Sequence, residues 1–323
     1  MNILYLIGNG FDKAQGLNTS YPEFYSWLHA QKPLNDFEAR IHNEIKGNYA
    51  NWADLEKALG QYSNQWNEPD VFRGVIRYFN TRLKEYLLLE DKKANSLSLN
   101  TQKFVQDLCN PQSYLEGQGQ DIFRKSVLDR IISDAGIDVV SFNYTSTFEI
   151  AVGERHHLGN YNSRNYYFRS VLHIHGTLDD MILVGVDNDE QIANASFRSN
   201  EDIRDEFIKP EINEGCQNTN NVTLSSLIEK ADVIVLFGLS IGITDNTWWH
   251  LIGQRMDNQY NQPVILFFPY DPTKDTKGNP NYKRRWSNSY IEFLKDRMKI
   301  NSSVEELKKS ICVGINKDFL KLV

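Results

Sequence analysis

The sequence contains only three cysteines and no long hydrophobic run. Cys109, Cys216 and Cys312 lie far apart in the 323-residue chain, and none belongs to a C-x-x-C pair. This spacing excludes a structural zinc site of the usual kind and argues against a disulfide framework. No run approaches the roughly 20 apolar residues that a membrane-spanning helix needs, and the apolar start at Ile3–Ile7 is too short for the core of a signal peptide. We therefore expect a cytoplasmic protein that makes no membrane contact.

The chain also lacks an excess of positive charge. Its 42 acidic and 35 basic side chains give a formal net charge of -7. A broad nucleic-acid-binding surface is basic, so the composition disfavours nucleic acid as a partner. The basic cluster Lys283–Arg285 follows a segment rich in turn-forming residues, Asp271–Tyr282, which we interpret as a surface loop. We interpret the cluster as solvated charge, with a phosphate or nucleic-acid contact as the alternative.

What the sequence does contain is a set of short apolar runs that predict strands. Each run is mostly continuous rather than alternating, as in strands that are buried on both faces of a parallel sheet. The runs are Ile3–Ile7, Ile137–Phe142, Ser170–Ile174, Met181–Val186, Val233–Phe237 and Val264–Phe268. The predicted fold class is therefore α/β with a parallel sheet.

The chain between the first two runs is expected to be helical. Apolar residues recur at three- and four-residue steps in Tyr21–Lys32, Asn51–Trp66 and Asp70–Glu90. We interpret residues 13–135 as a helical insertion after the first strand, and residues 1–12 together with 136–270 as the nucleotide-binding sheet domain. Residues 271–323 are expected to form a helical C-terminal extension that packs on the sheet, with helices around a last strand.

Polar or glycine-containing turns directly follow four of the runs. They are Gly8-Asn9-Gly10-Phe11-Asp12, Asn143-Tyr144-Thr145, His175-Gly176 and Gly238-Leu239-Ser240. Ligands of open α/β sheets bind outside the carboxyl ends of the strands. The four turns are therefore expected to gather at one ligand site, although each of them has a purely structural interpretation as well.

The first turn matches only part of the dinucleotide fingerprint G-x-G-x-x-G, because Lys13 stands in place of the third glycine. This disfavours an ordinary hydride-transferring dehydrogenase, while glycine at these positions still favours close approach to a phosphate. Asn143 is either a turn residue or a group that orients a water or a ribose hydroxyl. His175, two residues after His173, is either a structural histidine or a general base, and the glycine after it would leave room for a ligand.

Two further kinds of chemistry are disfavoured by the spacing of the residues. Gly238, Ser240 and Gly242 satisfy the hydrolase pattern G-x-S-x-G. A catalytic triad would need a later histidine, and only His250 follows, about two turns into the next predicted helix. No H-E-x-x-H pattern exists and the other nearby histidines stand in a loop, so we expect no metal.

Read together, these motifs resemble the bacteriophage abortive infection AbiH family. The resemblance rests on Asn2–Asp12 (NILYLIGNGFD), Thr19-Ser20-Tyr21 with Phe24, Trp52–Glu56 (WADLE), Ser141–Thr145 (SFNYT), His173–Gly176 (HIHG) and Phe237–Asp245 (FGLSIGITD). That family is in turn similar to sirtuin-like nucleotide-binding proteins. The resemblance implies a role in anti-phage defence and a Rossmann-like, sirtuin-like sheet with a helical insertion.

The resemblance also implies roles for individual residues. Asn143 and His175 would be the catalytic pair. The cofactor-binding residues would be Gly8, Asn9, Gly10, Phe11, Asp12, Thr145, Gly238, Ser240 and Asp245. Sirtuins have an aspartate where this chain has Thr145, and their deacetylase members use four cysteines for a zinc ribbon. The three scattered cysteines therefore disfavour protein deacylation.

The leading hypothesis is that the protein hydrolyses NAD, as its substrate, to nicotinamide and ADP-ribose without a metal. The backbone amides of residues 8–11 would hold the pyrophosphate, and His175 would act as the general base. The alternative is a pocket that binds NAD or an ADP-ribose-type nucleotide without turnover, as a sensor or assembly module. A homo-oligomer or a phage-derived trigger is expected as a further partner.

Overall fold

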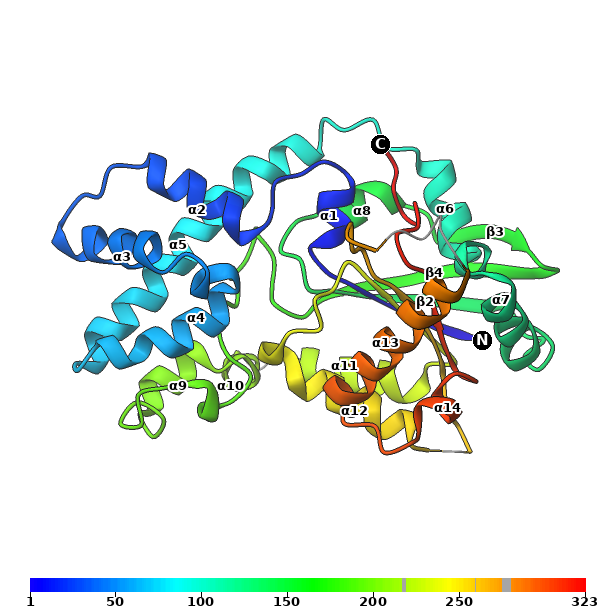
Figure 1. Ribbon diagram of the computed structural model, residues 1–323. Coiled ribbons are helices and arrows are strands. Elements are labelled where there is room, and N and C mark those ends of the chain that lie inside the picture. Colours follow the sequence, from blue (N-terminus) through cyan, green and yellow to red (C-terminus); the bar gives the residue numbers. More distant parts are fainter. Residues whose placement is uncertain (217–218, 259, 275–279) are drawn as a thin grey trace.

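The computed structural model describes residues 1–216, 219–258, 260–274 and 280–323 (Figure 1). Within these residues the centre of the fold is a seven-stranded sheet with the order β3-β4-β2-β1-β5-β6-β7. The strands are β1 (Asn2–Ile7), β2 (Ala135–Ser141), β3 (His157–Tyr161), β4 (Arg164–His173), β5 (Val233–Phe237), β6 (Val264–Phe268) and β7 (Ile311–Val313). Neighbouring strands are parallel except β3, which runs antiparallel to β4. The expected α/β class with a mostly parallel sheet is confirmed.

The central strand, β1, lies between β2 and β5, and the strand order reverses there. Its side chains alternate between two apolar cores: Ile3, Tyr5 and Ile7 belong to one, and Leu4 and Leu6 belong to the other. Because both faces are buried, the strand reads as a continuous apolar run. The reversal of strand order beside β1 creates the kind of crevice in which open α/β sheets bind ligands.

Helices cover both faces of the sheet. The core that contains Ile3 includes residues of α1 (Gly10–Ala14), α6 (Thr101–Cys109), α7 (Gly117–Phe123) and α8 (Thr147–Val152). The core on the other face includes residues of α11 (Asn220–Lys230), α12 (Asn246–Met256), α13 (Pro280–Met298) and α14 (Val304–Leu307). Among the described residues, none of the helices combines the length and the apolar character needed to cross a bilayer.

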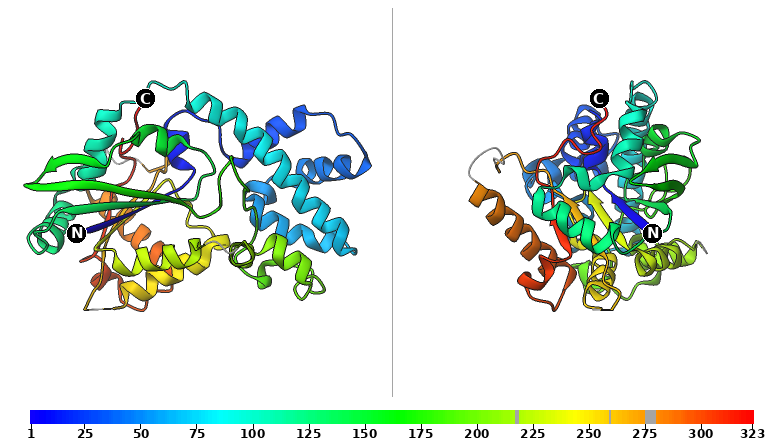
Figure 2. Two further views of the ribbon diagram at one scale, coloured as in Figure 1. Left: turned by 180° about the vertical axis from the view of Figure 1, so that it is seen from behind. Right: turned by 90° about the vertical axis from the view of Figure 1, so that its right-hand side faces the viewer.

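A third apolar core lies beside the sheet, in what we call the helical body. It is formed by α2 (Tyr21–Ala30), α3 (Asp36–Gly47), α4 (Leu55–Tyr62), α5 (Pro69–Ala94) and α9 (Glu201–Phe207), together with the irregular chain between residues 178 and 197. Figures 1 and 2 show this body at one end of the molecule, and α10 (Lys209–Gly215) leads from it back toward α11. The stretch 13–135 is thus shared between the helical body and the layer that contains α6 and α7.

The helices of the helical body begin where their sequences supply caps. Ser20 and Glu23 form a capping box at the start of α2, and the side chain of Asn35 accepts a hydrogen bond from Glu38 N at the start of α3. The side chain of Asp54 accepts from Lys57 N and begins α4. Such caps satisfy backbone N–H groups that have no partner within the first turn. The predicted helix at residues 51–66 is accordingly divided, with a 3₁₀ turn before Asp54.

One predicted strand is wrong. Met181–Val186 forms no strand and makes only isolated bridges, from Ile182 to Gly176 and from Val186 to Ile208. Ile182, Val184 and Val186 are buried in the core of the helical body instead. A short apolar run indicates burial, but it does not say whether the buried segment joins a sheet.

The C-terminal region adds a strand as well as helices. β7 pairs in parallel with β6 and forms one edge of the sheet. The segment Asp271–Tyr282 was predicted to be a surface loop, and residues 275–279 of it lie outside the described part of the chain. α13 begins at Pro280, so the end of the segment is helical and places Lys283–Arg285 in a helix.

Candidate functional site

A cavity of about 430 Å³ lies where the carboxyl ends of β1, β2 and β5 face the helical body. Ten of the eleven residues that the sequence suggested line it: Gly8, Asn9, Gly10, Asp12, Asn143, Thr145, His175, Gly238, Ser240 and Asp245. The helical body contributes the opposite wall, with Tyr21 and Pro22 of α2, Asp54 and Glu56 at the start of α4, and Leu83 and Leu87 of α5. The four polar turns therefore converge on one cavity.

Phe11 is the exception. Its side chain is fully buried in the core of the sheet, where its ring lies 5.6 Å from that of Phe148 and 6.3 Å from that of Phe104. Its backbone N–H donates to Gly8 O at 2.9 Å. Phe11 therefore does not line the cavity, because its ring anchors α1 to the sheet and its N–H is already bonded.

The first and fourth turns are packed directly against each other. Gly8 N donates to Phe237 O at 3.0 Å, and Gly10 N donates to Gly238 O at 2.8 Å. A Cβ on Gly10 would lie 2.5 Å from Gly238 Cα, and Gly238 itself has a φ of +69°. The glycines are therefore required by this close approach and by the positive φ.

This packing corrects the expected phosphate cradle. Three amides in the range 8–11, those of Gly8, Gly10 and Phe11, already donate to carbonyl oxygens of the chain. They are not free to hold a pyrophosphate without rearrangement. The glycine after His175 also has a structural cause, because a Cβ on Gly176, which has a φ of +78°, would lie 1.9 Å from Met181 O.

Asn143 follows β2 and is held from three sides. Its backbone N–H donates to Ser141 Oγ at 3.1 Å, and its side-chain amide donates to Gly8 O at 3.2 Å. Its backbone carbonyl lies 2.8 Å from Nδ1 of His173, whose Nε2 lies 2.5 Å from Glu149 Oε1. Burial lowers the pKa of His173, but the hydrogen bond and charge of Glu149, the Asn143 carbonyl and the charge of Asp12 together outweigh it, so the net pKa is raised. His173 thus positions Asn143 and does not line the cavity.

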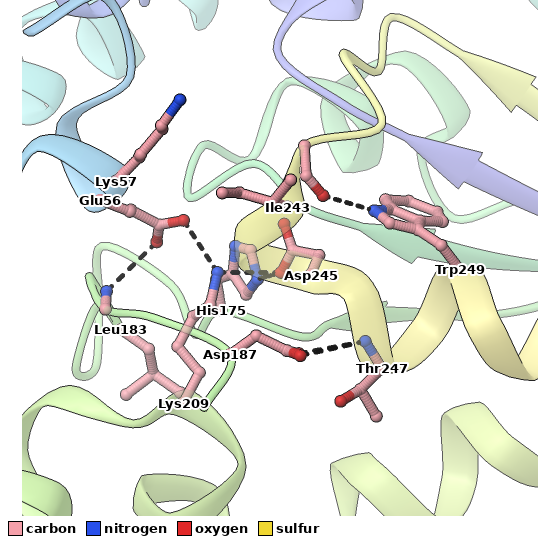
Figure 3. A network of polar contacts seen from close by, with 12 residues as sticks. Glu56, Lys57, His175, Leu183, Asp187, Lys209, Ile243, Asp245, Thr247 and Trp249 are labelled. Carbon is pink, nitrogen blue, oxygen red and sulfur yellow. Dashed lines mark hydrogen bonds and ion pairs between the residues drawn. The ribbon is translucent and has the colours of Figure 1, made fainter. Parts of the chain in front are cut away.

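His175 belongs to a buried network of four ionisable side chains (Figure 3). Its Nε2 lies 2.8 Å from Asp245 Oδ1, and the same oxygen lies 2.9 Å from Lys209 Nζ. Lys209 Nζ also donates to Glu56 Oε2 at 2.8 Å, and Glu56 Oε1 accepts from Gly185 N at 3.2 Å. The network joins the sheet side of the cavity to the helical body.

The charges of this network determine the state of Asp245. Burial alone would raise its pKa, but the Lys209 ammonium and His175 hold the pKa well below the ordinary value. Burial likewise raises the pKa of Glu56, and Lys209 only partly opposes that rise. Because Nε2 of His175 faces Asp245 Oδ1, Nδ1 is the ring nitrogen that makes no hydrogen bond with another described residue.

Asp12 is the second unusual carboxyl group of the cavity. It is only 1% exposed, and its Oδ2 accepts from Thr145 Oγ1 at 2.6 Å. Its Oδ1 is buried and has no hydrogen-bond partner among the described residues. Burial raises the pKa of Asp12 to about 7, although the hydrogen bond from Thr145 acts in the opposite direction. Asp12 is therefore a buried acidic residue in the wall of the cavity with one unsatisfied carboxyl oxygen.

The residues that sequence reasoning missed come from helices. Glu56 stands in the WADLE motif of the family resemblance, but no role followed from the motif alone. Lys209 had no signal in the sequence, because a single lysine at the start of a helix is ordinary.

His250 does not line the cavity, so no Ser-His pair with Ser240 forms there. The lining carries four carboxyl groups, of Asp12, Asp54, Glu56 and Asp245, and one lysine, Lys13.

Comparison with known proteins gives one family. The model of the family described as bacteriophage abortive infection AbiH matches residues 4–267, which is more than half of the chain. The matched range contains every residue of the cavity and ends before α13. A search of curated proteins finds no match.

Proposed function

This chain belongs to the bacteriophage abortive infection AbiH family, and we propose that its cavity hydrolyses NAD to nicotinamide and ADP-ribose. The observation that supports the proposal is the convergence of Asp12, Asn143 and His175 on one cavity of about 430 Å³. A cavity of this volume is within the range of small-molecule sites, about 300–1,000 Å³. The three side chains offer a carboxyl group, an amide and a base for breaking the bond between ribose and nicotinamide.

In the proposed reaction, the bond between the ribose C1′ and the nicotinamide nitrogen breaks while a water oxygen bonds to C1′. The electron pair of the broken bond leaves with nicotinamide, which becomes neutral. The proton lost by the water passes to His175 Nδ1. Asp245 supports this role because it occupies Nε2 at 2.8 Å and is itself kept ionised by Lys209. A general base of this kind contributes about 10²- to 10⁴-fold to the rate.

Positive charge develops on the ribose as nicotinamide leaves, and the acidic lining suits that charge. In the proposal, Asp12 Oδ1, which has no partner among the described residues, accepts a hydrogen bond from a ribose hydroxyl. Sirtuin-like enzymes would have an aspartate at the position of Thr145. Here Thr145 donates to Asp12 at 2.6 Å, so a carboxyl group is supplied at nearly the same place by the first turn.

In the proposal, the phosphates of NAD are bound by side chains rather than by the backbone amides of residues 8–11. Lys13 is the cation of the lining, and its side chain is 48% exposed, with Glu23 at 3.9 Å as its ion-pair partner. The hydroxyl of Ser240 lines the cavity beside Gly238. In the proposal, Lys13 and Ser240 hold the pyrophosphate toward the solvent side, and the acidic residues surround the nicotinamide riboside.

The test is release of nicotinamide from NAD by the purified protein, followed by chromatography. We expect His175→Ala and Asn143→Ala each to reduce the rate by about 10²- to 10⁴-fold. His156→Ala is the matched control, because His156 is exposed and lies outside the cavity. If the wild type and His175→Ala are equally inert, at high protein concentration and also in extracts of phage-infected cells, the proposal is wrong.

The replacement of the sirtuin aspartate by Thr145 favours a second function, in which the cavity binds NAD or ADP-ribose and does not turn it over. Calorimetry separates the two functions. Tight binding with no product supports the sensor, and product formation supports the enzyme. Absence of binding to any adenine nucleotide contradicts both.

A further inference from the structure

A second cavity, of about 530 Å³, lies along the edge of the sheet that β7 forms. Its floor is β7 with the residues that follow it, and its walls are α7 on one side and α13 on the other. We call it the β7 groove. Residues that line it include Gly117, Ile122, Lys283, Arg284, Ile311 and Val313. Figure 2 shows α13 (orange) at the outer margin of the molecule.

The floor of the groove presents backbone groups that have no partner. β7 pairs with β6 alone among the described strands, through Ser310 O and Gly314 N at its two ends, each in a bond of 2.8 Å. In a parallel ladder alternate residues bond to the same neighbour. Ile311 and Val313 therefore direct their N–H and C=O groups away from β6, and these make no hydrogen bond with another described residue.

These unpaired backbone groups are shielded from solvent. Ile311 is only 2% exposed. Backbone N–H and C=O groups that are shielded from water are nearly always paired in folded proteins. An extended chain laid beside β7 would pair them, in the way that peptides add a strand to an exposed sheet edge.

The charged residues that line the groove indicate which charge an extended chain bound there should carry. The lining holds four cations, of Lys283, Arg284, Lys308 and Lys317, and two carboxylates, of Glu116 and Glu305. Lys283 and Lys317 share Glu116 at 3.0 and 3.2 Å, and Lys308 pairs with Glu305 at 2.5 Å.

Arg284 is exposed and forms no ion pair with any described residue. The groove is thus locally positive in a chain whose net charge is -7. A second copy of the chain is a poor occupant, because pairing of two β7 edges would place the two cationic rims against each other.

We propose that the β7 groove binds an extended acidic segment of a partner protein, which adds a strand beside β7. The strand edge from Ile311 to Val313 is about 10 Å long at roughly 3.3 Å per residue, which accommodates three residues of the partner. Acidic side chains of that segment meet Arg284 and the lysines of the rim. This inference is independent of the proposed reaction, because the groove lies outside the catalytic cavity and binding is measured without NAD.

The experiment uses a fluorescein-labelled decapeptide of alternating Glu and Val and measures fluorescence anisotropy with the full chain. We expect the peptide to bind, and the corresponding Lys-Val peptide not to bind. Arg284→Glu should weaken binding at least tenfold. Arg285→Glu is the matched control, because Arg285 is the next residue on α13, is also exposed and does not line the groove.

Two N-methylated peptides test the strand itself without changing the protein. Each peptide is methylated at alternate residues, and the two peptides together cover both sets of alternate N–H groups. Only the N–H groups that face β7 are needed for pairing, so one peptide should lose binding and the other should keep it. Equal effects of the two sets, equal effects of Arg284→Glu and Arg285→Glu, or no binding of the Glu-Val peptide would each overturn the proposal. Preferential binding of a single-stranded decanucleotide would likewise assign the groove to nucleic acid and overturn it.

Discussion

Replacing Asp12 with asparagine should stabilise the protein, and the gain should grow with pH. The folded state raises the pKa of Asp12 from 3.8 to about 7, chiefly through burial. A carboxyl group with a raised pKa holds its proton longer when folded, so its contribution to stability is complete below the unfolded pKa and is lost as the pH rises through the folded pKa. Asparagine has the shape of the protonated acid and does not ionise.

The size of the effect follows from the shift of the pKa. At about 1.4 kcal/mol per unit, the variant should exceed the wild type in free energy of unfolding by about 2 kcal/mol at pH 5 and by about 4 kcal/mol at pH 8. The two proteins should be equally stable below about pH 3. Urea denaturation followed by circular dichroism at pH 5 and pH 8 measures the difference directly.

A second variant at this contact should be less stable than the wild type. Thr145→Val removes the donor to Asp12 Oδ2, which leaves the ionised group still less satisfied, so this variant should lose more stability at pH 8 than at pH 5. Equal stability differences for Asp12→Asn at the two pH values, or a less stable variant at pH 8, would refute the account of Asp12 as a buried and poorly satisfied acid.

Three further predictions follow from the packing. Lys209→Met leaves Glu56 and Asp245 without their buried cation and should lower the free energy of unfolding, measured by urea denaturation, by about 3–5 kcal/mol. This loss of stability should shrink below pH 6. The double variant Lys209→Met with Glu56→Gln should recover part of the lost stability. Gly10→Ala should cost about 1–3 kcal/mol because of its contact with the fourth turn, whereas Gly47→Ala, at a helical position with nothing within 4 Å, should be neutral or stabilising by up to about 1 kcal/mol. Cys216 is exposed and should be the one thiol that reacts rapidly with Ellman's reagent in the native protein; the two buried cysteines, whose pKa values burial raises to about 12, should react only after unfolding.

Much of the sheet could be predicted because its strands are buried on both faces. β1, β5 and β6 each contain a continuous apolar run, and β2 appears as an apolar run that Asp138 interrupts. β3 could not be found in this way, because it is a short antiparallel edge strand in which Leu158 alone is buried. The same signal produced the wrong strand at Met181–Val186, since the core of the helical body buries an apolar segment as completely as a sheet does.

The site was predictable to the extent that it follows the strands. Turns after parallel strands meet at one edge, and that rule brought together residues as distant as Asp12 and Asp245. It gave no information about Glu56, which lines the cavity from the helical body, or about Lys209, which pairs with both Glu56 and Asp245. It also did not indicate that the Phe11 side chain is buried in the core, since position along a turn does not say whether a side chain points to the cavity or to the core.

The interlocked first and fourth turns change how related sequences should be read. Gly8, Gly10 and Gly238 are fixed by contact between two backbone segments, and this requirement would persist in a relative whose cavity had lost every ligand. A glycine pattern at these positions is therefore a marker of the fold and carries no weight as a marker of activity. Under the proposed reaction, active and inactive relatives should instead be distinguished by what stands at Asp12 and His175.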